Sequence, residues 1–351
     1  MNPAVTVVIP HYRAPVLVDC LRSVFAHTSP PFGVIVVDDG QLAPSLQTAQ
    51  AQFPRIRVLH NPRNLGFSAS CNRGLEEVDT RYAVLLNDDT RVTPQWLAPL
   101  VETAESDPSI AACQPKLLSA TEPGRFDYGG GAGGYIDRLG YTFCRGRIME
   151  TCEQDRGQYD NEASLFWACG SALFVRMEAV RRIGLLDLDY HMHFEEIDLC
   201  WRLQLAGYRI RAVPRSVVYH HSGYSLPPRS FRKAYLNHRN NLVMLCKNLD
   251  ARSLVWVLPV RILLELAATC LYAGRRNWPA VTAPLAALCW LVIHPGNLLT
   301  RRRQVRARTD PRYRSRARLQ GPGVYRGSIA WRYYVHGIRR ANQLIPEEKA
   351  G

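Results

Sequence analysis

The chain has 351 residues, of which 47% are hydrophobic, which is enough for one large α/β domain with an appendage or for two domains. The first ten residues, MNPAVTVVIP, lack a basic segment and a small-residue cleavage site, and the ten cysteines form no CxxC pair and no Cys/His metal pattern. These features argue against a disulfide framework and a zinc module, and they predict a chain without a signal peptide in the reducing cytosol.

The net charge of +14 is unevenly distributed. Residues 301–351 contain thirteen Arg and one Lys against three acids, a net charge of +11. A basic tail of this kind indicates contact with an anionic membrane surface or with nucleic acid. The segments before the tail help to decide between these two partners.

Strand and helix patterns alternate along the first 90 residues. Each strand pattern is a short apolar run, and each helix pattern has apolar residues at helical spacing. The strand patterns cover residues 4–9, where Pro10 ends the run, and residues 33–37, 56–60 and 82–86, and the helix patterns cover 15–27 and 67–78. This alternation predicts an α/β fold with a doubly wound, mostly parallel sheet and helices on both faces.

Polar residues are concentrated where the predicted strands end. They occur at Pro10-His11-Tyr12, Asp38-Asp39, 61–67 and 87–90. Ligands of doubly wound sheets bind at the carboxyl ends of the strands. The sequence therefore predicts a ligand site along this edge.

The middle of the chain contains a glycine-rich segment. Residues 119–165 have little periodicity, and their glycines do not follow a strand and open a helix, so the dinucleotide-binding fingerprint is absent. We expect a long loop that crosses the active-site face. Strand patterns follow at 165–176, 208–213 and 216–219, with a short helix at 177–183.

Three carboxylates stand at the start of a further helix pattern. Glu195, Glu196 and Asp198 precede apolar residues at helical spacing. Acids at a helix N-terminus are favoured by the helix dipole, which is a purely structural explanation. Crowded acids also raise the pKa of one member, and such a carboxylate can accept a proton from a hydroxyl group.

Three further motifs have both a chemical and a structural interpretation. Asn87-Asp88-Asp89 offers hard oxygen ligands for Mg²⁺ or Mn²⁺ bridging a diphosphate, but Asn and Asp are also common in turns. Asp38-Asp39 can accept hydrogen bonds from a base or ribose, or form a turn. His220 or His221 could complete a metal shell, or the two could be a surface pair.

The C-terminal third changes character at about residue 230. A helix pattern covers 231–249, and residues 253–273 are apolar except for Arg261 and Glu265. Residues 278–300 contain no Asp, Glu, Lys or Arg but include three prolines, so they fit a membrane span, an interfacial helical pair or a buried hairpin. The basic block RRRQVRAR follows directly, which favours an anionic membrane surface over nucleic acid.

The succession of motifs resembles glycosyltransferase family 2. The matching segments, in chain order, are VTVVIPHY, VIVVDDG, NPRNLGFSASCNRGL, YAVLLNDDT with TPQWL, GSALFVR, FEEIDLCWRLQLAGYRI, VVYHHSGYS and HRNNLVML, over about residues 4–247. The glycine-rich segment and the hydrophobic, basic C-terminus are similar to bacterial rhamnosyltransferase-like members that build surface polysaccharide. The resemblance implies a Rossmann-like GT-A domain over residues 1–230, a membrane-associated helical region over 231–300 and a basic tail over 301–351.

The resemblance also implies roles for individual residues. Pro10, Tyr12, Asp38, Asp39, Arg63, Asn64, Asn87 and Asp88 match the segments that hold the nucleotide-sugar. Asp89 matches the last acid of the family's DxD motif and is expected to bind Mn²⁺ or Mg²⁺, although Asn87 replaces the first acid. His220 lies five residues before Ser225, as in the family's H-x-x-G-x-S pattern, and is preferred to His221 as a metal ligand.

Glu196 matches the position of the family's catalytic base, with Glu195 as the second candidate and Asp198 as support for the helix start or the acceptor. The implied reaction is an inverting transfer of a sugar from a nucleoside-diphosphate donor to a glycan or glycolipid acceptor. The implied location is the cytoplasmic face of the plasma membrane. Two other classes stay open: a metal-dependent nucleotidyltransferase, and a non-catalytic protein that binds a membrane surface or nucleic acid.

Overall fold

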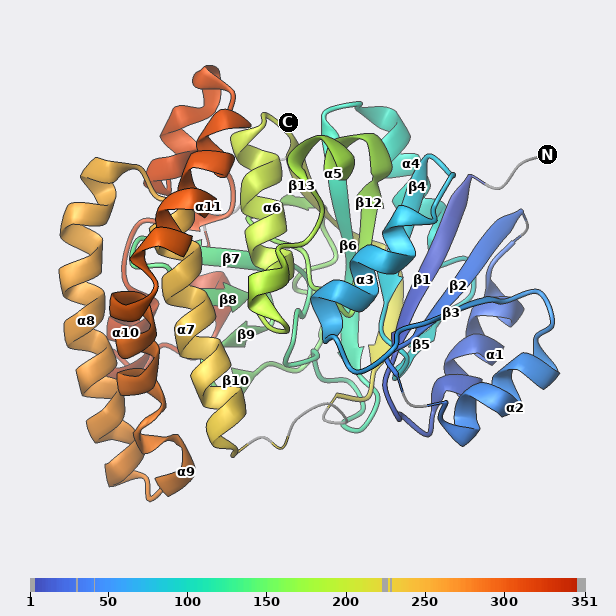
Figure 1. Ribbon diagram of the computed structural model, residues 1–351, viewed down its shortest axis with the longest axis horizontal. Helices are drawn as coiled ribbons and strands as arrows, with labels where there is room; N and C mark the ends of the chain where they lie inside the picture. Colours follow the sequence, from blue (N-terminus) through green and yellow to red (C-terminus); the bar gives the residue numbers. More distant parts are fainter. Residues whose placement is uncertain (1–3, 30, 41, 223–226, 228, 346–351) are drawn as a thin grey trace.

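We analysed a computed structural model of the chain, which describes residues 4–29, 31–40, 42–222, 227 and 229–345. Figure 1 shows a sheet-based body on one side and a group of long helices on the other. The strands are β1 Val5–His11, β2 Phe32–Asp38, β3 Arg57–His60, β4 Tyr82–Leu86, β5 Thr90–Val92, β6 Ile110–Ser119, β7 Gly134–Asp137, β8 Thr142–Cys144, β9 Arg147–Ile148, β10 Thr151–Cys152, β11 Ala163–Ser164, β12 Ala172–Arg176, β13 Arg209–His220 and β14 Val324–Tyr325. The α-helices are α1 Leu17–His27, α2 Pro44–Gln52, α3 Phe67–Glu76, α4 Leu97–Ser106, α5 Met177–Ile183, α6 Glu195–Leu205, α7 Phe231–Asn248, α8 Ala251–Gly274, α9 Trp278–Val281, α10 Ala283–Ile293, α11 Pro295–Ala307 and α12 Ile329–Tyr334.

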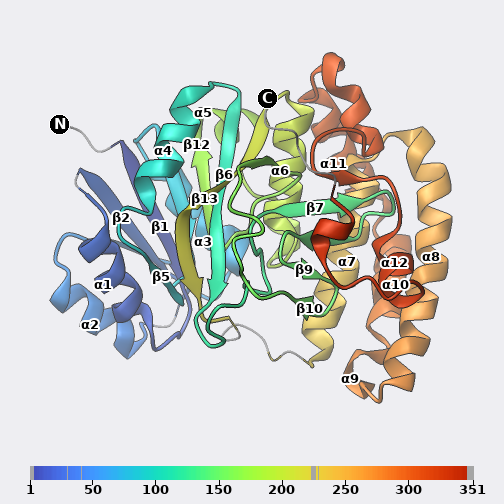
Figure 2. The ribbon, with the colours of Figure 1, turned by 180° about the vertical axis from the view of Figure 1, so that it is seen from behind.

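The large sheet confirms the predicted fold class. Within the described residues its strand order is β11-β13-β6-β12-β4-β1-β2-β3, and β5 pairs with β13. The strands β3, β2, β1 and β4 are mutually parallel, whereas β12 is antiparallel to both of its neighbours. The helices α3, α5 and α6 lie on one face, at the front of Figure 1, and α1 and α4 lie on the other, which faces the viewer in Figure 2.

The first strand runs further than the sequence predicted. β1 continues through Pro10 to His11. Its pairing with β4 ends at Val8, while Pro10 pairs only with Val37 of β2. Proline has no backbone N–H, so it is tolerated in a strand where one neighbour is missing.

The segment 119–165 is not the long loop that we expected. Within the described residues, β7 to β10 form a second sheet in the order β10-β9-β8-β7-β14. Its strands have two to four residues, which is too short for a visible alternation of apolar and polar side chains. A side chain at Gly134 would meet the Trp167 ring at 2.2 Å, so this glycine allows β7 to pack closely against Trp167. The predicted strands at 208–213 and 216–219 are one strand, β13, with an irregularity between Val213 and Val217.

The C-terminal helices α7, α8, α10 and α11 gather at the end of the molecule remote from α1 and α2 (Figures 1 and 2). α8 is one helix in the described part of the chain that is long and apolar enough to cross a membrane, and α9–α10 with α11 would form a second span only with a 77° bend. The predicted domain boundary at residue 300 falls inside α11. In addition, β14 of the predicted tail pairs with β7 of the predicted first domain. The division into three domains stays a prediction.

Candidate active site at the carboxyl edge of the sheet

The two aspartates that follow β2 organise the adjacent loops. Asp39 accepts hydrogen bonds from Asn61 Nδ2 at 2.9 Å, from Leu65 N at 2.8 Å and from Gly66 N at 3.0 Å. Asp38 Oδ2 accepts one from Leu42 N at 3.2 Å. Both aspartates are buried. Much of their hydrogen-bonding capacity therefore shapes the loops that border the predicted nucleotide site.

Other predicted donor-site residues lie on the surface of the same edge. Arg63 and Asn64 are exposed in the loop after β3, and Tyr12 is 41% exposed after β1. Gly40 brings the two loops together, because it has φ of +86° and a side chain there would lie 2.4 Å from the backbone carbonyl carbon of Arg63. The exposed side chains are thus held next to the buried aspartates and remain accessible to a ligand.

The Asn87-Asp88-Asp89 motif follows β4, and its three side chains have different partners. Asp88 Oδ2 lies 2.6 Å from Nδ1 of His11, and burial raises the pKa of Asp88 although His11 opposes the shift. Asp89 Oδ1 lies 3.1 Å from Nε2 of His220. Asn87 Nδ2 is 3.4 Å from the same nitrogen, while Asn87 Oδ1 is buried without a hydrogen-bond partner among the described residues.

His220 is held between two carboxylates. Its Nδ1 lies 3.1 Å from Oδ1 of Asp127. The Asp127 side chain is almost fully buried and also accepts hydrogen bonds from Gly129 N at 2.7 Å and Ser222 Oγ at 3.0 Å. Burial alone would lower the pKa of His220, but Asp127 and Asp89 raise it to about 10. Asp127 was not predicted from the sequence, where its only signal is its position two residues before the glycine run in FDYGGG.

These side chains fit a divalent cation in part. The described residues contain no cluster of three or more His, Cys, Asp and Glu side chains arranged to hold a metal. Asp89 and His220 do face one another, and the unpartnered oxygen of Asn87 is a third donor close to them. Metals that bind nucleotide phosphates often take only one or two carboxylates from the protein and further ligands from the substrate. His221 donates its backbone N–H to Asp89 O at 3.0 Å, and Ser225 lies outside the described residues.

The glutamate pair begins α6. Both Glu195 and Glu196 are in the first turn, and Oε2 of each is buried without a hydrogen-bond partner among the described residues. Burial raises the pKa of Glu195, and the charge of Glu196 raises it further. Burial also raises the pKa of Glu196, although backbone amides, including that of Gly170, oppose the shift. One proton shared by the pair would relieve the repulsion between them.

The segment 169–171 connects the glutamate pair to the aspartate motif. A side chain at Gly170 would be in ordinary contact with Cβ of Glu196 at 3.7 Å. The next residue, Ser171, accepts a hydrogen bond from Asn87 N at 3.0 Å through its backbone oxygen. The structure therefore brings together two motifs that are more than 100 residues apart in the sequence.

A strained turn presents the glutamates. His191, His193 and Phe194 all have positive φ, at 59°, 68° and 73°, a conformation that costs a non-glycine residue about 1–3 kcal/mol. Nδ2 of Asn240 on α7, which is fully buried, lies 3.1, 2.8 and 2.7 Å from the backbone oxygens of Tyr190, Met192 and His193. Helix α7 thereby holds the turn in shape, a role that the sequence analysis did not predict.

Asp198 has a different environment from the two glutamates. It is fully buried and accepts hydrogen bonds from Arg202 Nε at 2.7 Å, Lys247 Nζ at 2.8 Å and Asn248 Nδ2 at 2.8 Å. Burial alone would raise its pKa, but Lys247 and Arg202 hold it well below the usual range. Asp198 thus joins α6 to α7, and its oxygens already have strong partners.

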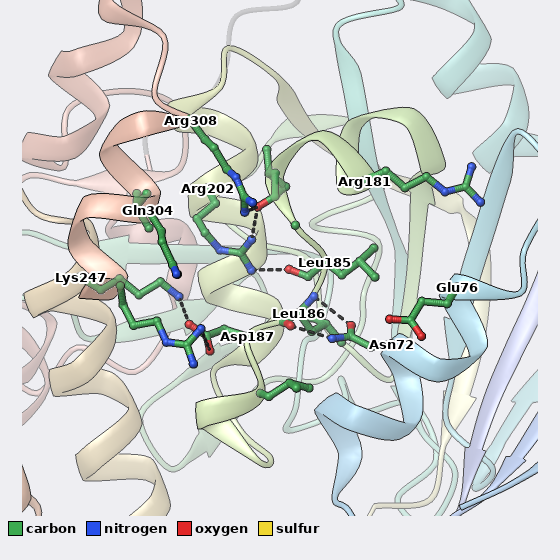
Figure 3. Close-up of a pocket in the computed structure, with 15 residues that line it drawn as sticks. Asn72, Glu76, Arg181, Leu185, Leu186, Asp187, Arg202, Lys247, Gln304 and Arg308 are labelled. Atoms are coloured by element: carbon green, nitrogen blue, oxygen red, sulfur yellow. Dashed lines mark hydrogen bonds and ion pairs between the residues drawn. The ribbon is translucent and has the colours of Figure 1, made fainter. Parts of the chain in front are cut away.

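A cavity of about 570 Å³ lies away from the predicted donor-site, metal and glutamate residues. Figure 3 shows it between α3, the 183–188 loop, α6 and α11, with Asn72, Glu76, Gln304 and Arg308 among its lining side chains. Arg202 and Lys247 also line it, although both are paired with Asp198. None of the predicted donor-site, metal or glutamate residues lines this cavity.

Comparison with known proteins shows which proteins the chain resembles. Residues 6–160 match the sequence profile described as "Glycosyl transferase family 2". The chain is 25% identical over 273 residues, 73% of its length and 87% of the relative's, to N-acetylglucosaminyl-diphospho-decaprenol L-rhamnosyltransferase of Mycobacterium tuberculosis.

Two solved structures support the fold. GalNAc-T7 with UDP, GalNAc and Mn²⁺ aligns with a TM-score of 0.56 at 16% identity, covering 71% of this chain and 49% of that one. The mannosyltransferase PcManGT of Pyrobaculum calidifontis, in complex with GDP-Man and Mn²⁺, aligns with a TM-score of 0.51 at 16% identity, covering 90% and 86%. Residues 6–160 therefore resemble glycosyltransferase family 2, and together with the strand-edge motifs these matches indicate a glycosyltransferase with the GT-A fold.

Proposed function

We propose that this glycosyltransferase moves a sugar, with inversion, from a nucleoside-diphosphate donor to a hydroxyl group of a lipid-linked glycan acceptor in surface polysaccharide synthesis. The observation that carries the proposal is the glutamate pair: Oε2 of each is buried and unpartnered, and the pair lies next to the segment that contacts the Asn87 motif. A carboxylate with a raised pKa and one buried, unpartnered oxygen is a suitable acceptor for a hydroxyl proton.

The donor is proposed to bind along the carboxyl edge of β1, β2 and β4. Asp38 and Asp39 are assigned to the nucleoside, with the exposed Tyr12, Arg63 and Asn64 beside them. Pro10, Asn87 and Asp88 complete the proposed donor site. Asp38 and Asp39 are buried and already hydrogen-bonded, so the loops they shape have a fixed form before the ligand binds.

Asp89 and His220 are proposed to hold Mn²⁺ or Mg²⁺, with Asn87 Oδ1 close by. Such a cation neutralises the negative charge that develops on a leaving diphosphate. Two relatives in fold were solved with Mn²⁺, which supports the assignment. His220 would then bind through Nε2, while its Nδ1–H donates to Asp127, the arrangement that orients many histidine ligands.

Glu196 is proposed as the base and Glu195 as the acid that tunes it. The acceptor oxygen loses its proton to Glu196 and forms a bond to the anomeric carbon from the face opposite the nucleotide. The bond from that carbon to the phosphate oxygen breaks, and its electron pair leaves with the nucleoside diphosphate. One displacement of this kind inverts the anomeric configuration. Asp198 is proposed to position the helix start rather than to touch the acceptor.

The acceptor and location follow from the relatives and from the C-terminal helices. The M. tuberculosis relative is named for a lipid-linked acceptor, a diphospho-decaprenol. The basic C-terminal segment and the apolar α8 support contact with an anionic membrane. We therefore propose that the protein works at the cytoplasmic face of the plasma membrane, as a peripheral or monotopic protein.

The test is a donor screen with purified protein. UDP-, GDP- and dTDP-sugars are offered with and without Mn²⁺ in the presence of a prenyl-diphosphate sugar, and the released nucleotide is measured. Transfer requires release of a nucleoside diphosphate, and NMR of the product should show the inverted anomer.

Glu196→Gln should abolish this release. Glu178→Gln, at an exposed glutamate in the first turn of α5, should leave it unchanged. Release of pyrophosphate from a nucleoside triphosphate would instead identify a nucleotidyltransferase, and full transfer by Glu196→Gln would refute the assigned base.

A further inference from the structure

Helix α8 has a reversed distribution of polar and apolar side chains. Its buried residues are Ser253, Val257, Arg261 and Glu265, which follow one another at intervals of four residues along one face. Its exposed side chains include Val255 and Leu263, which are 76% and 66% exposed. A helix on the surface of a water-soluble domain buries its apolar face and exposes its polar one, so the outer face of α8 calls for a nonaqueous neighbour.

The buried polar face attaches α8 firmly to the catalytic body. Arg261 donates hydrogen bonds to Leu139 O at 2.8 Å, to Asn241 Oδ1 on α7 at 2.6 Å and to Glu265 Oε1 at 2.6 Å. Glu265 also pairs with His238 of α7. These contacts bind the middle of α8 to α7 and to the loop between β7 and β8.

The same contacts decide how α8 can meet a membrane. A helix of 24 residues is long enough to cross a bilayer. A crossing would place Arg261, Glu265 and the β7–β8 loop, whose backbone is not helical, at the depth of the hydrocarbon. Such backbone and charges are costly there. Helix α8 can instead lie along the membrane surface with its outer face in the lipid.

Large apolar side chains are also exposed on α9, α10 and α11, which contact α8 or one another. We call this surface the apolar face, and define it by exposed side chains on α8, α9, α10 and α11. Its members, each 36–79% exposed, are Val255, Trp256, Val260, Ile262, Leu263, Leu266, Leu271, Trp278, Leu285, Val292, Ile293 and Leu299. A concentration of large exposed apolar side chains on neighbouring helices marks an interaction surface.

Positive charge accompanies the apolar face. Arg252 and Arg276 stand at the two ends of α8, and Arg303 and Arg306 are on α11. All four are exposed, and none has a carboxylate partner among the described residues. Arginine beside an exposed apolar helix face is complementary to anionic lipid headgroups above hydrocarbon.

We propose that the apolar face is a monotopic membrane-binding surface that inserts into the interface of a bilayer rich in anionic phospholipid, with α8 parallel to the membrane plane. This inference rests on the proposed location and adds the surface and the orientation. It gives the protein a defined side toward the membrane and keeps α8 from acting as a span.

The test is flotation of the purified full-length chain with vesicles. Phosphatidylcholine vesicles are compared with vesicles that contain about 30 mol% phosphatidylglycerol, enough to give a negative surface potential. We expect strong binding only to the anionic vesicles. Leu263→Glu combined with Val292→Glu should lower the binding constant by at least about tenfold, because each removes a buried apolar side chain from the lipid and adds a negative charge. Ala51→Glu, at an exposed position of α2, is the matched control and should bind like wild type.

Further variants and measurements distinguish the possible explanations of a negative result. Arg303→Gln with Arg306→Gln should weaken binding to anionic vesicles and leave binding to neutral ones unchanged. Wild-type protein that does not float, or a double-glutamate variant that floats like wild type, would overturn the proposal. A concentration-dependent dimer in light scattering that the double-glutamate variant loses would also overturn it, in favour of self-association. Donor-dependent release of nucleoside diphosphate without vesicles tests the proposed function separately, because the apolar face lies outside the proposed catalytic residues.

Discussion

Two substitutions on the same helix should change stability in opposite directions. Glu196→Gln removes a charge from a carboxylate that has a buried, unpartnered oxygen and a neighbouring acid, Glu195. Asp198→Asn removes a charge from a carboxylate that has three close donors. The first change should stabilise the fold while it abolishes transfer, and the second should destabilise the fold.

The magnitudes follow from the contacts. A buried polar group without a partner costs about 1–3 kcal/mol, so relief at Glu196 should raise the free energy of unfolding by about 1–2 kcal/mol. Breaking a buried ion pair by removing one partner costs about 3–5 kcal/mol. We expect about 3 kcal/mol for Asp198→Asn, at the low end of that range, because Lys247 keeps Asp187 at 2.6 Å. Since 1 kcal/mol shifts Tm by about 2 °C in a chain of this size, the two variants should differ by about 8–10 °C.

The pH dependence provides a second check. The pKa of Glu196 is raised in the folded state, so the folded protein binds more protons than the unfolded chain, and stability falls as pH rises above the usual glutamate value of about 4.3. Glu196→Gln should remove part of this loss, and its advantage should therefore grow from pH 5 to pH 7.5. The pKa of Asp198 is lowered, so its contribution is complete above about pH 4 and is lost as pH falls further.

The assay is thermal unfolding of both variants at pH 5 and pH 7.5, with nucleotide release measured on the same samples. Glu178→Gln controls for the loss of a glutamate in the first turn of a helix. If Glu196→Gln lowers Tm by as much as Asp198→Asn, Glu196 is a structural acid and the reasoning is wrong.

Three further predictions concern residues outside the glutamate pair. Asn240→Ala should release the strained turn before α6, and in steady-state kinetics it should lower kcat at least about tenfold while changing donor KM little. An unchanged kcat would mean that the turn needs no support from Asn240. Asp127→Asn should weaken Mn²⁺ binding about 10–100-fold, measured by electron paramagnetic resonance without donor, because His220 loses its orienting carboxylate; equal affinity would argue against His220 as a ligand. Arg261→Met should leave Glu265 buried without its cation and lower the free energy of unfolding by about 3 kcal/mol or more, measured by denaturant unfolding; a loss below about 1 kcal/mol would show that the pair does not fasten α8.

The sequence by itself determined the parallel half of the large sheet. β4 occupies 82–86 and α5 occupies 177–183, as predicted, because buried parallel strands are continuous apolar runs and short helices have a clear period. It also indicated the edge on which the polar motifs meet, since parallel strands that share a direction end together. Asp38 and Asp39 lie at that edge, and Asp89 lies within 3.1 Å of His220, the histidine that the sequence favoured.

Tertiary structure decided what local pattern cannot encode. The small sheet formed by β7–β10 and β14 has strands too short to show a period, and β14 comes from more than 180 residues further along the chain. The opposite surroundings of Glu196 and Asp198 depend on α7, whose Lys247 and Asn248 donate hydrogen bonds to Asp198. The sequence showed that the run that forms α8 is apolar apart from Arg261 and Glu265, but it did not say which side of the helix these two residues face. Their contacts with α7 and the β7–β8 loop turn them inward and leave the apolar side outside.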